Sequence, residues 1–153
     1  MNFIRRFCCY STATIPGWKD TIPFVPPISG GFVIKVYDGD TITIASKLPY
    51  KKSPLYRFSV RLNRIDAPEI KGITKKETQM AIISRDKLAE KCLGKKVTLT
   101  EIKREKYGRV LADVYCDGLF LNEWMIEQRL AVKYDGGTKE KINWGEYMKE
   151  YKK

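Results

Sequence analysis

Alternating apolar and polar residues predict β-strands in the first half of the chain. The segment FVIKVY at residues 32–37 has the period of two that is typical of a strand, and Asp38-Gly39 is a tight-turn signal. The alternation resumes in TITI at residues 41–44. After a polar loop, residues 55–65 form a third β-rich run, which Asp66-Ala67-Pro68 ends. This half of the chain therefore predicts a β-meander.

The second half combines helices with further strands. Ala81, Ser84, Leu88 and Cys92 recur at steps of three to four, which indicates one buried face of a helix, and Gly94 follows at a C-cap position. The expected elements are a helix over residues 74–93, strands over 97–103 and 109–116, and a short helix that Asn122 caps and that runs to about Ala131.

Five strands with one long helix between the third and fourth are typical of a small barrel. We therefore predict an α+β protein with a five-stranded OB-fold barrel and about three helices. Proline and glycine residues interrupt the chain from Pro23 to Gly31, before the first strand. This boundary separates an N-terminal tail at residues 1–30, which is disordered or serves in targeting or anchoring, from a domain at residues 31–153.

The charge of the chain indicates a polyanionic partner. Its 153 residues contain 29 Lys and Arg against 18 Asp and Glu, which gives a formal charge of +11. Such an excess favours nucleic acid first and an anionic membrane surface second. The chain has no histidine, so catalysis that depends on histidine, such as Ser-His-Asp or Cys-His chemistry, is excluded.

The cysteines give little sign of metal binding, but two of them raise the question of a membrane anchor. No Cys-x-x-Cys spacing occurs, so a structural zinc site is not expected, and reduced thiols in a reducing compartment are the simpler interpretation. Cys8 and Cys9 follow Arg5 and Arg6, a combination that suits acylation together with attraction to a membrane. A weak targeting signal and a plain tail remain the alternatives for this end of the chain.

Three short segments carry residues suited to phosphodiester chemistry: DGDT at residues 38–41, RLNRIDAPE at 61–69 and EKYGR at 105–109. Each segment alone has a structural explanation, as a hairpin turn, a strand terminator or a charged turn. Phosphodiester hydrolysis needs the charge on the phosphate to be neutralised, a proton acceptor for the attacking water, and alignment of the nucleophile. Together the three segments contain side chains suited to all three tasks.

The first group of these residues is suited to a hard divalent cation. Asp40 and Asp66 are expected at strand ends, where their carboxylate oxygens are candidate ligands. Pro68 restricts Ala67 to an extended conformation, which fixes the direction of the Ala67 carbonyl and makes it a candidate third ligand.

The second group is suited to the reaction itself. Glu69 is close enough in sequence to act on a water next to the cation without being a ligand. Arg61 and Arg109 offer planar, permanently charged forks that match a phosphate in a bidentate manner. Lysine at these positions would bind less well, because a point charge does not hold two oxygens in register.

In this order, and on this framework of strands and helix, the three segments resemble the staphylococcal nuclease (thermonuclease) family. The resemblance covers about residues 31–134 and includes a fourth pattern, LN…LA, at residues 121–122 and 130–131. It implies the fold of that family and a calcium-dependent endonuclease that hydrolyses DNA and RNA and leaves 3′-phosphate ends. The implied partners are nucleic-acid substrates, and we expect a monomer.

The resemblance also implies a role for each matching residue. Asp40, Asp66 and the Ala67 carbonyl would bind Ca²⁺, and Glu69 would be the general base. Arg61 and Arg109 would bind the scissile phosphate and stabilise the transition state. The remaining implied positions are Lys106 and Tyr107 at the nucleotide and Asp38 and Thr41 beside the metal ligands.

The chain departs from the founding member of that family in ways that bear on substrate handling. Ala67 replaces a threonine, which is harmless if only the carbonyl binds the metal. The segment at residues 70–77 is short and rich in lysine where that member has a long loop, and Arg64 adds a cation near the site. The ending at residues 133–137 resembles members from large DNA viruses and eukaryotic intracellular forms. It favours an intracellular setting, with secretion or organelle targeting through residues 1–30 as the alternative.

A second hypothesis is a non-catalytic OB module that binds nucleic acid without cutting it. Nine tyrosines and three tryptophans are enough to provide stacking platforms for such a module. A binding module does not need the carboxylates and arginines all at once, and a chain that has lost catalysis usually lacks some of them. The complete set therefore favours an active nuclease.

Overall fold

The computed structural model describes residues 14–72, 74–139 and 141–149. Cys8 and Cys9, for which acylation is one hypothesis, lie outside the described residues. In the described part of the chain, no helix is both long enough and apolar enough to cross a membrane.

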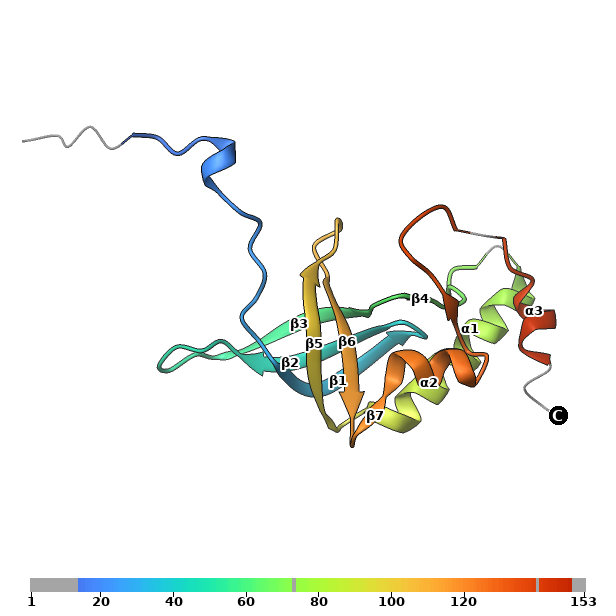
Figure 1. Cartoon of the computed structure of the whole chain (residues 1–153). Helices are drawn as coiled ribbons and strands as arrows, with labels where there is room; N and C mark the ends of the chain where they lie inside the picture. The colour runs from blue at the N-terminus through green and yellow to red at the C-terminus, as the bar shows by residue number, and fades with distance from the viewer. Residues whose placement is uncertain (1–13, 73, 140, 150–153) are drawn as a thin grey trace, which may run out of the picture.

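Five strands form a closed barrel, as predicted (Figure 1). They pair in antiparallel fashion in the order β3-β2-β1-β5-β6, and a parallel pairing between β3 and β6 closes the ring. The barrel strands are β1 (Gly30–Asp38), β2 (Thr41–Lys47), β3 (Leu55–Leu62), β5 (Lys96–Arg104) and β6 (Val110–Cys116). The α+β class and the five-stranded OB-type barrel are thus confirmed.

Helices and very short strands complete the fold. Figure 1 shows the three helices gathered on one side of the barrel, where α3 packs against α1. They are α1 (Lys75–Cys92), α2 (Leu121–Glu127) and α3 (Trp144–Tyr147). The short elements are β4 (Ile65–Asp66), which pairs with β8 (Val132–Lys133), β7 (Leu119–Phe120), and a single 3₁₀ turn at Trp18–Asp20.

Helix α1 follows its predicted pattern closely. The four residues predicted for its inner face, Ala81, Ser84, Leu88 and Cys92, are all buried. Ser84 Oγ also donates a hydrogen bond of 2.8 Å to the Leu130 carbonyl, which ties the helix to the segment that follows α2. The Thr74 side chain caps the helix by accepting a hydrogen bond from the Glu77 amide.

The chain contacts the barrel slightly before the first strand. Ile28 is buried within the hydrophobic core, and the Ser29 carbonyl accepts a hydrogen bond of 2.8 Å from the Leu99 amide of β5. The last residues of the segment predicted as a tail therefore pack on the barrel.

The third strand is shorter than predicted. We expected it to continue to Ile65, but β3 ends at Leu62 because Arg64 adopts a left-handed backbone conformation with a φ of 61°. The chain turns there and re-forms a strand at β4, opposite β8. This turn places Asp66 beside the end of β3 rather than along its continuation.

Asn122 is not a helix cap, contrary to the prediction. Helix α2 already begins at Leu121, and Asn122 is buried, with its Oδ1 accepting from the Val114 amide at 2.9 Å. Its Nδ2 donates to the Asn63 carbonyl at 2.9 Å and to the Ala112 carbonyl at 3.3 Å. The side chain therefore joins α2, β6 and the turn that leads to Asp66.

We expect Asn122→Ala to destabilise the protein by about 3 kcal/mol, because it leaves a buried amide and a buried carbonyl without partners. Urea unfolding followed by circular dichroism measures this change. The matched control is Asn143→Ala, since Asn143 is exposed and its side chain makes no capping hydrogen bond. The control is expected to change stability by less than about 0.5 kcal/mol. Equal effects of the two substitutions would contradict a structural role for the buried amide.

Candidate active site

The turn between β1 and β2 places Asp40 in the interior. Asp40 is 2% exposed, its amide donates to Asp38 Oδ1 at 3.2 Å, and its Oδ1 accepts from Thr41 Oγ1 at 2.8 Å. Only glycine fits at position 39, because a Cβ there would lie 2.0 Å from Ser84 Oγ and 2.8 Å from Ala67 Cβ. The DGDT turn is thus packed directly against α1 and the Asp66-Ala67 segment.

The surroundings of Asp40 favour a cation beside it. Burial and the neighbouring Asp38 carboxylate raise the pKa of Asp40 to about 7, although Arg61 and the hydrogen bond from Thr41 act in the opposite direction. A buried carboxylate of this kind is most stable as an anion when a positive charge is close.

Arg61 joins the two predicted metal carboxylates. Its Nη1 lies 2.5 Å from Asp40 Oδ2, and its Nη2 lies 3.0 Å from Asp66 Oδ1. The guanidinium also donates to the Ile65 carbonyl at 3.2 Å, so the turn after β3 holds it in place. A single cationic group thus reaches carboxylate oxygens of both aspartates.

Arg109 is held by the loop that precedes it. Its Nε and Nη2 donate to the two carboxylate oxygens of Glu105 at 3.1 and 3.0 Å, and its Nη1 donates to Thr41 Oγ1 at 3.3 Å. The hydrogen bond from Arg109 lowers the pKa of Glu105, and the same bond raises the pKa of Arg109. Both groups therefore stay charged, and the fork is oriented before any substrate arrives.

The same loop presents two residues to solvent. Tyr107 is 75% exposed, and Lys106 Nζ lies 4.9 Å from the centre of its ring. Gly108 has a φ of 87°, which a residue with a side chain rarely adopts, so it allows the tight turn between β5 and β6.

Glu69 carries an ion pair that the sequence pattern did not predict. Lys139 Nζ lies 2.9 Å from Glu69 Oε1 and 2.9 Å from Asp66 Oδ1. The hydrogen bond from Lys139 lowers the pKa of Glu69, which is consequently an anion at neutral pH. Burial opposes the charge on Lys139, but its hydrogen bonds to the two carboxylates raise its pKa.

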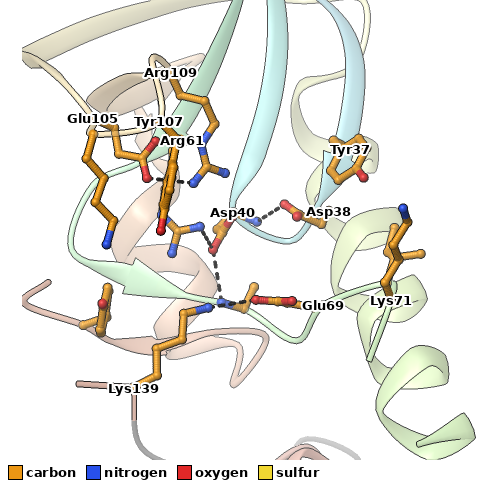
Figure 2. A pocket seen from close by; sticks show the side chains of 14 residues that line it. Tyr37, Asp38, Asp40, Arg61, Glu69, Lys71, Glu105, Tyr107, Arg109 and Lys139 are labelled. Carbon is orange, nitrogen blue, oxygen red and sulfur yellow. Dashed lines mark hydrogen bonds and ion pairs between the residues drawn. The ribbon is translucent and has the colours of Figure 1, made fainter. Parts of the chain in front are cut away.

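These groups line one cavity of about 520 Å³ (Figure 2). Eight of the ten predicted site residues contribute to its wall: Asp38, Asp40, Arg61, Ala67, Glu69, Lys106, Tyr107 and Arg109. The other two are close by, since Asp66 contacts Arg61 from a neighbouring cavity and Thr41 is buried between Asp40 and Arg109. The structure therefore brings the three sequence segments together.

Some neighbours of the site differ from expectation. Arg64, expected as an extra cation near the site, pairs with the buried Asp113 carboxylate of β6 and lines a neighbouring cavity together with Arg61 and Lys106. Tyr37 and Tyr134 also line the cavity without having been predicted. Tyr37 continues the alternating pattern of β1, and that pattern indicates a strand residue but not that the ring borders the site.

Within residues 14–72, 74–139 and 141–149, no three acidic, histidine or cysteine side chains are placed to hold a metal ion together. The predicted ligand set is of another kind, since it consists of two carboxylates and a backbone carbonyl. Arg61 engages Asp40 Oδ2 and Asp66 Oδ1, and Lys139 also engages Asp66 Oδ1, so a bound cation would share or take over carboxylate oxygens that these side chains hold. Oxygen donors of this type suit a hard cation.

Comparison with known proteins places the chain in a family. The model of the family described as staphylococcal nuclease homologue matches residues 59–153. An Escherichia coli protein named as an uncharacterized endonuclease is 35% identical over 106 residues, which are 69% of this chain and 61% of that protein. Staphylococcal-like nuclease CAN1 of Arabidopsis thaliana is 35% identical over 78 residues, which are 51% of this chain and only 22% of that protein. This chain belongs to the staphylococcal nuclease homologue family.

Proposed function

We propose that this protein is a calcium-dependent endonuclease that hydrolyses DNA and RNA and leaves 3′-phosphate ends. The observation that carries the proposal is the convergence of two arginine forks, Asp40 and Glu69 on one cavity, with Asp66 bound to Arg61 at its edge. The endonuclease and nuclease names of the relatives support the general class of activity.

Asp40, Asp66 and the Ala67 carbonyl would hold the calcium ion. When bound, Ca²⁺ would neutralise charge on the phosphate and make a neighbouring water more acidic. The close packing of the DGDT turn on Ala67 keeps these donors together, because the Ala67 amide also points to Asp40 Oδ2 at 3.4 Å.

Glu69 would accept the proton of the attacking water. Its carboxylate is anionic at neutral pH and faces the cavity, where Lys139 fixes one of its oxygens (Figure 2). The hydroxide oxygen would then bond to phosphorus, and the bond from phosphorus to the 5′ oxygen would break. The 5′ oxygen would leave and take a proton from solvent water, which gives a 3′-phosphate on one product and a 5′-hydroxyl on the other.

Arg61 and Arg109 would stabilise the charge that develops on the phosphate. Each guanidinium offers paired N–H donors, and both are already oriented by carboxylates of the protein. Lys106 and Tyr107, on the exposed loop between β5 and β6, would contact the nucleotide that carries this phosphate.

The direct test is release of acid-soluble product from single-stranded DNA in calcium and in excess chelator. We expect cutting only in calcium. The new 5′ ends should accept phosphate from polynucleotide kinase without prior phosphatase treatment, because they are hydroxyls. Cutting that persists in chelator would contradict the calcium requirement, and ends that need phosphatase would contradict the bond assignment. Binding in a gel shift without cutting in calcium would favour the non-catalytic module.

A further inference from the structure

A second cavity of about 700 Å³ adjoins the first, and its position suggests a further contact with the substrate. It is lined by the start of α1 and by the segment that leads into α3. Ala67, Glu69 and Lys139 line both cavities, so the two are neighbours that share one wall.

Two lysines of the second cavity lack an anionic partner among the described residues. Lys76, in the first turn of α1, and Lys141, shortly before α3, are both exposed, and neither forms an ion pair or hydrogen bond with a described residue. Lys139 differs from them, because both Asp66 and Glu69 engage its ammonium group. Among the described residues, the ammonium groups of Lys76 and Lys141 are therefore cations of this cavity that no carboxylate pairs.

The place of Lys76 depends on a glycine of α3. A Cβ at Gly145 would lie 2.1 Å from Lys76 Cε and 2.7 Å from its Nζ. The lysine stem thus crosses the bare backbone of Gly145, which carries the ammonium from α1 to the opposite wall of the cavity. A side chain at position 145 would push this charge away.

The other groups of the cavity are compatible with an anion. The Glu69 carboxylate lies at the shared wall, and the Asp66 carboxylate lines the second cavity alone. Lys139 engages both carboxylates, and Arg61 also engages Asp66. Glu77 is the remaining acid in the lining. The exposed amide of Asn143 adds a further hydrogen-bond donor beside the lysines.

We propose that this second cavity binds a backbone phosphate next to the scissile one on the same nucleic-acid strand, through Lys76 and Lys141. The inference rests on the proposed function for the location of the scissile phosphate. Lys106 and Tyr107 line the first cavity but not the second, so the two groups of residues contact different parts of the strand. A nucleic-acid strand that spans both cavities is bound at an internal position rather than at one of its ends. Such binding suits an enzyme that cuts internally.

The test is the salt dependence of binding for the double variant Lys76→Gln/Lys141→Gln. Its affinity for a fluorescent single-stranded oligodeoxythymidylate is measured in EDTA over a range of salt concentrations. Each phosphate of single-stranded nucleic acid that the protein neutralises contributes about 0.7 to the slope of log affinity against log salt. Because the two lysines bind one phosphate, we expect the slope of the double variant to be shallower than that of the wild type by about 0.7.

The matched control is Lys51→Gln/Lys52→Gln, which removes the same charge. Both control lysines are exposed at the tip of the β2–β3 hairpin, away from α1 and α3 (Figure 1), and their loss should leave the slope unchanged. An unchanged slope in the cavity variant, or an equal decrease in both variants, would overturn the proposed subsite. The measurement needs neither calcium nor cutting, so a failure of the nuclease assay is a separate result. Circular dichroism checks that both variants fold.

Discussion

Glu69→Gln is expected to lower turnover on single-stranded DNA about a hundredfold or more, while nucleic-acid binding stays nearly intact. Glutamine has the size of glutamate and keeps a carbonyl oxygen that can accept from Lys139, but an amide cannot take the proton of the attacking water. Binding should persist because the arginines and lysines of the cavity are unchanged. Initial rates in calcium and a gel shift in EDTA measure the two quantities separately.

A matched carboxylate-to-amide change controls for the loss of one negative charge. Glu123 is exposed in the first turn of α2 and does not line the cavity, so Glu123→Gln should cut at the wild-type rate. Unchanged turnover in Glu69→Gln would exclude Glu69 as the general base. A parallel loss of binding and turnover would instead indicate that Glu69 supports the shape of the site.

The barrel was predictable because its signals are local. Each of its five strands has an alternating pattern or a turn signal within a few residues of its ends. The pairing that closes the barrel is not local, since Val60 of β3 lies beside Val110 of β6. The strands β4, β7 and β8 have two residues each and no period that a pattern can reveal. The number of helices was likewise predicted more accurately than the residues at which they begin and end.

The site residues that could be predicted are those that lie close together in the sequence, within short motifs. The three segments contain all of the predicted positions, and eight of these line one cavity. Lys139 contacts Glu69 from 70 positions away, and nothing in its immediate sequence indicates this contact. Glu105 stands within a recognised segment, but its role in orienting Arg109 appears only when both side chains are seen in space.

Asn122 shows how a local rule gives a wrong prediction. An asparagine before a helical pattern is a typical N-cap, and this rule considers only the neighbouring residues. The structure instead uses the amide to satisfy Val114, Asn63 and Ala112, which come from β6 and from the turn after β3. Burial in a packed interior decided the role of this side chain, and burial is a property of the whole fold.

Arg109→Lys is expected to lower turnover about a hundredfold or more, although the positive charge remains. Loss of one preorganised donor to a developing oxyanion has an effect of this size. Lysine also cannot form the two parallel hydrogen bonds that Arg109 makes with Glu105, so its ammonium is no longer directed by the loop. Initial rates in calcium measure the effect. The control Arg57→Lys changes an exposed arginine of β3 that does not line the cavity, and it should leave the rate unchanged.

A comparison of Arg109→Lys with Arg109→Gln separates charge from geometry. The glutamine variant lacks both, so the difference between the two variants measures what a positive charge alone contributes. The difference between the lysine variant and the wild type measures the contribution of the oriented fork. If geometry dominates, lysine recovers only a small part of the activity that glutamine loses. A lysine variant close to the wild type would show that charge suffices, and the hydrogen bonds between Glu105 and Arg109 would then have no catalytic consequence.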